Sequence, residues 1–185
     1  MLIAVLVLAG IGLLIVFMGI SYYNRFVRLK NKVEDSWSGI DVQLKRRYDL
    51  IPNLLETVKG YATHEKEIFN NVADARARAL GAGGKGEKIA AENQLTGALR
   101  SLFAIAENYP DLKANSNFQQ FQQQLSKLED EIQMSRRYYN ATVREFNTGI
   151  AVFPANIIAN SFNFTPYQFF ELEDHTQRDA PQVKF

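Results

Sequence analysis

Few residues in this chain have the types and spacing that acid–base or metal chemistry requires. The sequence contains no cysteine and two histidines, His64 and His175. A helix would place His64 and Glu67 on one face, but two side chains do not complete a zinc site, and the HExxH pattern is absent. We therefore interpret His64 as a surface residue beside carboxylates, and we predict no catalytic residue, no metal and no cofactor.

Two other stretches of the sequence resemble functional sites, one a catalytic carboxylate pair and the other a phosphate-binding loop. The acidic run Glu129–Glu131 could pose as a carboxylate pair, but its spacing to Lys127 and Arg136 is typical of charge pairing on a helix surface. The glycine-rich stretch Gly81–Gly86 lacks the GxxxxGK[ST] pattern, and no strand precedes it. It therefore indicates a loop between two helices.

Glu65 and Arg76 form the polar pair of most interest, because they interrupt an otherwise apolar seam. A buried polar pair can fix the register of packed helices. We expect these two side chains to fill that structural role, with each other or with Arg136 and Glu145 of a later helix. A role in proton transfer is the weaker alternative.

Long amphipathic helices must position these side chains. Between residues 33 and 79 the apolar residues recur at steps of three and four, which predicts one helix with one buried face. The step from Leu44 to Tyr48 follows another step of four, which is typical of a stutter in a heptad seam. The apolar positions are Val33, Trp37, Ile40, Leu44, Tyr48, Ile51, Leu55, Val58, Ala62, Phe69, Val72 and Ala79.

Pro52 is the obvious interruption of this helix. It cannot donate a hydrogen bond to the carbonyl of Tyr48, and its ring crowds that turn, so we expect a kink. The apolar positions keep their register across Pro52, and a turn that reverses the chain would have no reason to preserve it. We therefore expect the helix to continue to about residue 80.

Two further helices follow the glycine-rich loop. The apolar periodicity predicts them over about 87–107 and about 117–153, and Pro154 closes the second. An aromatic segment follows at 155–172. We expect the helix at 117–153 to run parallel to the first long helix.

These patterns predict an all-α fold, in which an N-terminal transmembrane helix continues into an elongated bundle of long amphipathic helices. The predicted parts are a transmembrane anchor at 1–21, a bundle at 22–172 whose long helix covers about 22–80, and a polar tail at 173–185.

The first 20 residues carry no charged side chain. As a helix they are about 30 Å long, which is the thickness of a bilayer's hydrocarbon core. A cleaved signal peptide is the alternative, but the stretch has no basic n-region and its apolar run is longer than a signal peptide needs. Ala9, Gly12 and Gly19 lie near one stripe of this helix and would let two copies approach closely.

An aromatic pair and four basic residues follow and are predicted to form the interface of the anchor with the membrane. The positive-inside rule places the C-terminal bundle in the cytoplasm and the N-terminus outside. The opposite orientation is the alternative, because long domains can cross regardless of charge. The interface residues are Tyr22, Tyr23, Arg25, Arg28, Lys30 and Lys32.

The lengths of the second and third helices do not match. They would span about 30 Å and about 55 Å, so roughly 25 Å of the third helix's apolar face lacks cover from the second. Either the aromatic segment 155–172, a second copy of the chain or another helical protein must cover it. The candidate surface for self-association or for a partner consists of Phe146, Ile150, Phe153, Phe162, Phe164, Phe169 and Phe170.

Four segments, in this order, resemble the LemA family. They are LKRRYDLIPNLLETVKGYATHE at 44–65, YPDLKANSNF at 109–118, LEDEIQMSRRYYNATVREFN at 128–147 and FP at 153–154, and the chain closes with PQVKF. The resemblance implies a single-span bacterial membrane protein with a helical bundle, usually thought to have its short N-terminus outside. It brings no agreed biochemical activity and no catalytic residues.

The net charge of +1 gives no reason to expect a nucleic-acid partner, and we interpret the basic triplet Lys45–Arg47 as a solvated helix face. We expect a non-enzymatic scaffold of the LemA type in the bacterial inner membrane, which forms a coiled-coil-like homo-oligomer and shapes or decorates the bilayer. The alternative is a regulatory adaptor that recruits another membrane or cytoplasmic protein, of the protease or kinase type. The oligomeric state separates the two.

Overall fold

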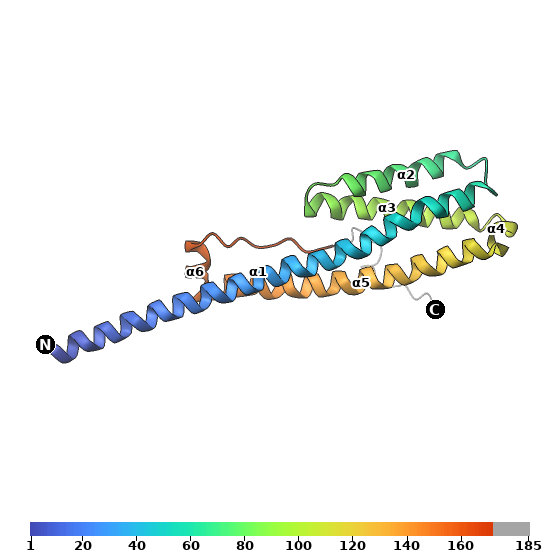
Figure 1. Ribbon diagram of the computed structural model, residues 1–185. Coiled ribbons are helices and arrows are strands. Elements are labelled where there is room, and N and C mark those ends of the chain that lie inside the picture. Colours follow the sequence, from blue (N-terminus) through green and yellow to red (C-terminus); the bar gives the residue numbers. More distant parts are fainter. Residues whose placement is uncertain (172–185) are drawn as a thin grey trace, which may run out of the picture. The chain divides into compact units, whose positions relative to one another are not determined.

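The computed structural model describes residues 1–171, and within them it contains helices and no strand, as the periodicity predicts. The predicted tail at 173–185 and His175 lie outside the described residues. The chain divides into two compact units: unit 1 consists of Met1–Ile40 and Met134–Phe169, and unit 2 of Asp41–Gln133 followed by Phe170. The helices are α1 (Leu2–Lys59), α2 (Lys66–Gly81), α3 (Lys85–Ala106), α4 (Pro110–Ala114), α5 (Ser116–Ala151) and α6 (Ala155–Ser161) (Figure 1).

The predicted single helix to about residue 80 is wrong, because α1 ends at Lys59 and α2 begins only at Lys66. Gly60, a poor helix former, starts the turn between them. Both arms of a helical hairpin bury their apolar faces in the same core, so Ala62 and Phe69 on either side of the reversal are both buried. A preserved apolar register therefore does not exclude a reversal.

Unit 2 is an up-down-up-down set of helices made by the C-terminal part of α1, α2, α3 and the N-terminal part of α5. α3 runs parallel to α1, since Asp41 pairs with Lys88 at 2.9 Å and Arg47 with Glu92 at 3.2 Å. α2, which packs on α3, supplies the intervening return. The two later predicted helices match α3 and α5 closely.

The long helix α5 runs antiparallel to α1, so the predicted parallel direction is wrong. In unit 1, Lys32 pairs with Glu145 at 2.8 Å, whereas Trp37, further along α1, packs on Tyr139, earlier in α5, with ring centroids 5.3 Å apart. The additional reversal at Gly60 adds one helix to the count, and this changes the direction of every later helix.

Unit 1 packs the N-terminal part of α1, the C-terminal half of α5, α6 and the extended segment 162–169 on one another. Ser36 and Thr142, both buried, share a hydrogen bond of 2.9 Å across the α1–α5 contact. The apolar side chains buried in this unit include Phe26, Leu29, Val33, Trp37, Ile40, Tyr139, Val143, Phe146 and Ile150.

The aromatic C-terminal segment covers the apolar end of α5. The ring of Phe146 lies 6.3 Å from that of Phe164 and 5.3 Å from that of Tyr167. The Asn147 side-chain amide holds the segment by donating to the carbonyl of Tyr167 (2.8 Å) and accepting from its N–H (2.9 Å). Of the candidates for this cover, the chain's own aromatic segment therefore provides it.

Pro52 lies inside α1, and the carbonyl it leaves without a helical donor has another partner. The Nε–H of Arg76, on α2, donates to the Tyr48 carbonyl oxygen at 2.8 Å. A side chain from the returning helix thus supplies the hydrogen bond that proline cannot. This explains why the seam position Arg76 is occupied by a polar residue.

We expect Arg76→Met to lower the free energy of unfolding by about 1–2 kcal/mol, because the Tyr48 carbonyl loses its donor. Chemical denaturation of the full chain in detergent, followed by helical circular dichroism, measures the change. The matched control is Arg78→Met on the same helix, whose exposed side chain bonds Gln94, and which should change stability by less than about 0.5 kcal/mol.

A double-mutant cycle makes this test specific. Pro52→Ala returns an N–H to α1, so in that background Arg76→Met should cost about 1 kcal/mol less than in the natural chain. Equal costs of Arg76→Met in both backgrounds would show that the guanidinium does not replace the missing helical donor.

Candidate functional site

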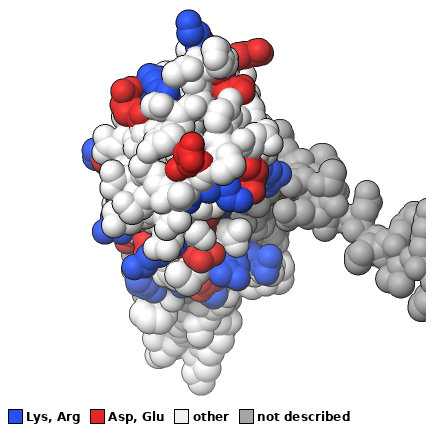
Figure 2. Space-filling view, turned by 90° about the vertical axis from the view of Figure 1, so that its right-hand side faces the viewer, with Lys and Arg blue, Asp and Glu red and all other residues white. Residues whose placement is uncertain are grey.

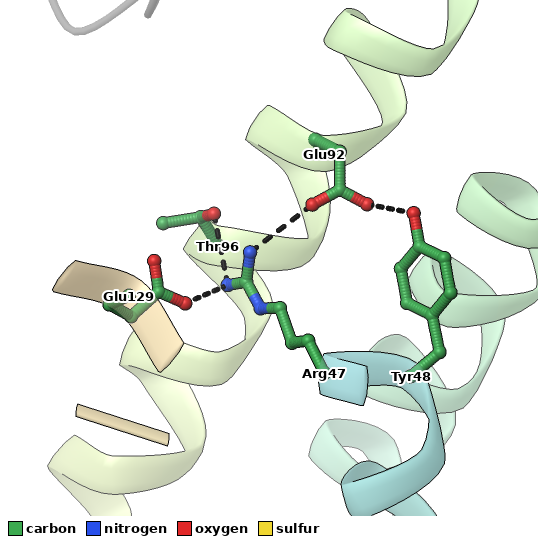
Figure 3. A network of polar contacts seen from close by, with 5 residues as sticks. All are labelled: Arg47, Tyr48, Glu92, Thr96 and Glu129. Atoms are coloured by element: carbon green, nitrogen blue, oxygen red, sulfur yellow. Dashed lines mark hydrogen bonds and ion pairs between the residues drawn. The ribbon is translucent and has the colours of Figure 1, made fainter. Parts of the chain in front are cut away.

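Unit 2 contains a network of charged and polar side chains inside the bundle (Figure 3). Arg47 and Tyr48 come from α1, Glu92 and Thr96 from α3, and Glu129 from α5. The guanidinium of Arg47 lies 3.2 Å from a Glu92 carboxylate oxygen and 2.9 Å from one of Glu129, and it donates to the Thr96 hydroxyl at 3.1 Å. The hydroxyl of Tyr48 donates to the other oxygen of Glu92.

The centre of this network is shielded from water. The side chains of Arg47 and Glu92 are 1% and 0% exposed, and that of Glu129 is 34% exposed. Burial, followed by the hydrogen bond to Glu92, raises the pKa of the Tyr48 hydroxyl far above its usual value. Tyr48 therefore keeps its proton and serves as a donor to the carboxylate, and it is not available as a base.

The network joins three helices, α1, α3 and α5. A surface hollow of about 540 Å³ lies elsewhere in unit 2, between α3, α4 and α5, and none of the network side chains lines it. Because the buried guanidinium bonds two carboxylates and a hydroxyl, only one register of α1, α3 and α5 satisfies all of them. The arrangement suits a structural clamp rather than acid–base chemistry.

The interpretation of Lys45–Arg47 as a solvated face is wrong for Arg47. Lys45 and Arg46 are largely exposed, with side-chain exposures of 75% and 61%, but Arg47 is buried. Sequence reasoning also missed Glu92. A strict alternation of four and three would have found both, since it leads through Arg47 on α1 and through Glu92 on α3. These seam positions are Val33, Trp37, Ile40, Leu44, Arg47, Ile51, Leu54 and Val58 on α1, and Glu92, Leu95, Leu99, Leu102 and Ala106 on α3.

The predicted pair Glu65 and Arg76 is half-buried, and the two side chains have separate partners. Glu65 accepts a hydrogen bond of 3.0 Å from the Tyr109 hydroxyl, which raises the pKa of that hydroxyl, whereas Arg76 donates to the Tyr48 carbonyl. Both fasten α2 and the α1–α2 turn to other parts of unit 2. His64 is exposed in that turn and does not lie on a helix.

The first part of α1 is long and apolar enough to cross a membrane, and none of that stretch is buried within the chain. Of the predicted interface residues, Arg25, Arg28 and Lys30 are exposed, while Lys32 is engaged by Glu145. The ring of Tyr22 stacks on that of Phe26, whereas the ring of Tyr23 lies 4.7 Å from that of Phe162 at a tilt of 56°. On the face drawn in Figure 2, basic and acidic side chains are interleaved without an extended area of one sign.

The predicted partner surface is wrong for Phe146, Ile150 and Phe170, because all three are buried within the chain. Phe164 and Phe169 are half-buried. Within this predicted surface, Phe153 and Phe162 are strongly exposed, at 80% and 57%.

Residues 36–185 match the model of the LemA family, which is most of the chain. This chain belongs to the LemA family. The match begins at Ser36, whose buried hydroxyl bonds Thr142, and it includes all five residues of the Arg47 network. The matched region therefore contains all of the described part of unit 2, whereas the exposed apolar stretch of α1 and the buried residues Phe26, Leu29 and Val33 of unit 1 precede it.

Characterised relatives support the same assignment. Protein LemA of Metamycoplasma hominis is 28% identical over 169 residues, which covers 86% of this chain and 77% of the relative. Magnetosome protein MamQ of Magnetospirillum gryphiswaldense is 25% identical, and magnetosome protein MamQ 2 of Paramagnetospirillum magneticum is 27% identical. Each match covers 80% of this LemA family chain and 64% of the MamQ protein, so the chain spans less than two thirds of the MamQ length. Together with α1, these likenesses describe a membrane-associated helical protein of the LemA type.

We expect Arg47→Met to destabilise the full chain by about 3–5 kcal/mol, because it leaves the buried Glu92 carboxylate without its cation. Glu92→Gln should destabilise the chain by less, because Arg47 keeps its ion pair with Glu129. Lys45→Met is the matched control. Lys45 pairs with Asp49 at 3.6 Å on the surface, so its loss should change stability by less than about 0.5 kcal/mol. Denaturant unfolding in detergent measures all three variants.

The double variant Arg47→Met/Glu92→Gln should cost at least about 1 kcal/mol less than the sum of the single costs, because it removes both charges while the amide still accepts from Tyr48. Additive costs would show that the guanidinium and the carboxylate do not stabilise one another.

Proposed function

We propose that this chain is a non-enzymatic, membrane-anchored helical scaffold that associates with itself through its apolar span. The observation that carries the proposal lies in α1. Its apolar side chains are exposed up to Ile20, and from Phe26 onward the same helix contributes buried residues to the core of unit 1. The same helix therefore serves as membrane anchor and as part of the core of unit 1. Its exposed apolar surface is stabilised by contact with lipid or with the same helix of another copy.

The non-enzymatic part rests on the use of the buried polar groups. The carboxylates of Glu92 and Glu129 are engaged by Arg47, and the raised pKa of Tyr48 keeps its hydroxyl protonated. The relatives named magnetosome protein MamQ and Protein LemA do not carry the name of a reaction, which agrees with a scaffold.

The span offers one open small-residue surface for self-association. A Cβ placed at Gly19 would lie 3.6 Å from the Ile158 side chain, so α6 already occupies that part of the stripe. A Cβ at Gly12 would meet nothing within 4 Å, and Ala9 lies one turn away on the same side. Small residues at this spacing let two helices approach closely in lipid.

The basic residues that follow the span support an inner-membrane location with the N-terminus outside and the bundle in the cytoplasm. Arg25, Arg28 and Lys30 are exposed and follow the apolar stretch directly, as the positive-inside rule expects for a cytoplasmic flank.

Mass measurement of the full chain in mild detergent and in nanodiscs, by size exclusion with light scattering, tests self-association. We expect a multiple of the 21.0 kDa chain mass for the natural protein. Gly12→Ile should shift the protein to monomer, because the branched side chain separates the two helices. Gly10→Ile should not, since Gly10 lies about 200° around the helix from Gly12, with equally open surroundings.

A natural protein that is monomeric at cellular concentration contradicts self-association. If that monomer co-purifies in fixed ratio with one other membrane or cytoplasmic protein, the adaptor role replaces the scaffold. If Gly12→Ile and Gly10→Ile change the mass of the assembly equally, the contact between copies does not lie on the Ala9–Gly12 surface.

A further inference from the structure

Four large apolar side chains stand exposed around α6. The exposed fractions are 49% for Val152, 80% for Phe153, 56% for Ile157 and 57% for Phe162. The opposite side of α6 is buried through Ala155 and Ala159. We call the four exposed residues the apolar collar. A group of bulky apolar side chains this exposed, within eleven positions of the sequence, indicates an interaction surface.

The apolar collar lies beside the end of the membrane-spanning stretch. Ile158 of α6 is in contact distance of the Gly19 position on α1, and the ring of Phe162 lies 4.7 Å from that of Tyr23. The uncharged apolar run of α1 ends at Ile20, so these contacts bracket its last turn. In Figure 1, α6 runs across the direction of α1 rather than along it, and its contacts with Gly19 and Tyr23 place it beside the end of the apolar stretch.

Charge is absent from both segments that meet at this level. The chain carries no Lys, Arg, Asp or Glu between Glu145 and Glu171, and none before Arg25. The exposed basic residues Arg25, Arg28 and Lys30 follow on α1 within the next turns. Apolar and aromatic side chains next to a short basic band are typical of the interface between hydrocarbon and lipid headgroups.

We propose that the apolar collar inserts into the interfacial layer of the same leaflet from which α1 emerges, as a second membrane contact besides the span. The occupant of this surface is therefore lipid, because the collar continues the lipid-facing surface of α1 without a charged gap. Phe153, Ile157 and Phe162 enter the boundary between acyl chains and headgroups, and Arg25, Arg28 and Lys30 face anionic headgroups. This second contact fixes the rotation and tilt of unit 1 on the bilayer, which a lone span leaves free. It does not depend on self-association.

Depth-dependent fluorescence quenching tests the insertion. The natural chain has no cysteine, so single variants such as Ile157→Cys and Phe162→Cys accept one environment-sensitive label each. The labelled full chains are reconstituted in vesicles of phosphatidylcholine and phosphatidylglycerol that carry a lipid with a shallow nitroxide. Tyr138→Cys is the matched control, because Tyr138 is 55% exposed on α5 of the same unit but lies far along α5 from the collar. Leu8→Cys reports on the span itself.

We expect shallow nitroxide lipids to quench the labels at positions 157 and 162 at least about twofold more strongly than the label at position 138. Equal quenching at positions 162 and 138, with the position 8 label quenched by deep nitroxides, overturns the second contact while leaving the anchor intact. Iodide in the buffer quenches labels that water can reach. If neither iodide nor the nitroxide lipid quenches the label at position 162, a second copy or another protein covers the collar, which also overturns the proposal. The mass of the assembly is measured separately, so failure of the scaffold and failure of the insertion remain distinguishable.

Discussion

The structure depends on one constraint: the single helix α1 is exposed and apolar on every side in its first part and must pack one face against protein in the next. From Phe26 to Ile40 it must bury this face in protein. The antiparallel half of α5 contributes to that cover, and so does the extended segment, since Phe164 packs on Phe26 and the Tyr167 hydroxyl donates to Glu34. The packing of unit 1 follows from the need to cover α1 immediately where its apolar stretch ends.

Unit 2 is specified by a different interaction, the buried charge of Arg47. An unpaired guanidinium inside a bundle is strongly unfavourable, so α3 and α5 must bring Glu92 and Glu129 to it in one register. The Pro52 position follows the same logic with a neutral group, since the freed Tyr48 carbonyl requires Arg76 from α2. The need to give each buried polar group a hydrogen-bonding partner, in addition to apolar contact, therefore determines which helices are neighbours in this unit.

Apolar periodicity predicted the helical class, and together with the glycine-rich loop and Pro154 it predicted the approximate boundaries of α3 and α5. The lack of charged side chains predicted the apolar stretch of α1. Periodicity could not predict the reversal after Lys59, because both arms of a hairpin bury their seams in one core and so continue the same pattern. Arg47 and Glu92 were missed because charged residues are seldom buried, although both lie on strict seam positions. The partner of the Tyr48 carbonyl is 28 positions away in the sequence, and no local pattern connects the two residues.

The central claim is that α1 is one continuous helix, serving as membrane anchor and as the core of unit 1. Hydrogen exchange of the full chain in nanodiscs, resolved along α1, tests it most directly. The account predicts that amides between Ile20 and Phe26 exchange as slowly as those near Trp37, because the helix has no hinge where the apolar stretch meets the packed core. Rapid exchange confined to residues 21–25, with slow exchange on both sides, would show that anchor and core are separate elements and would contradict the account.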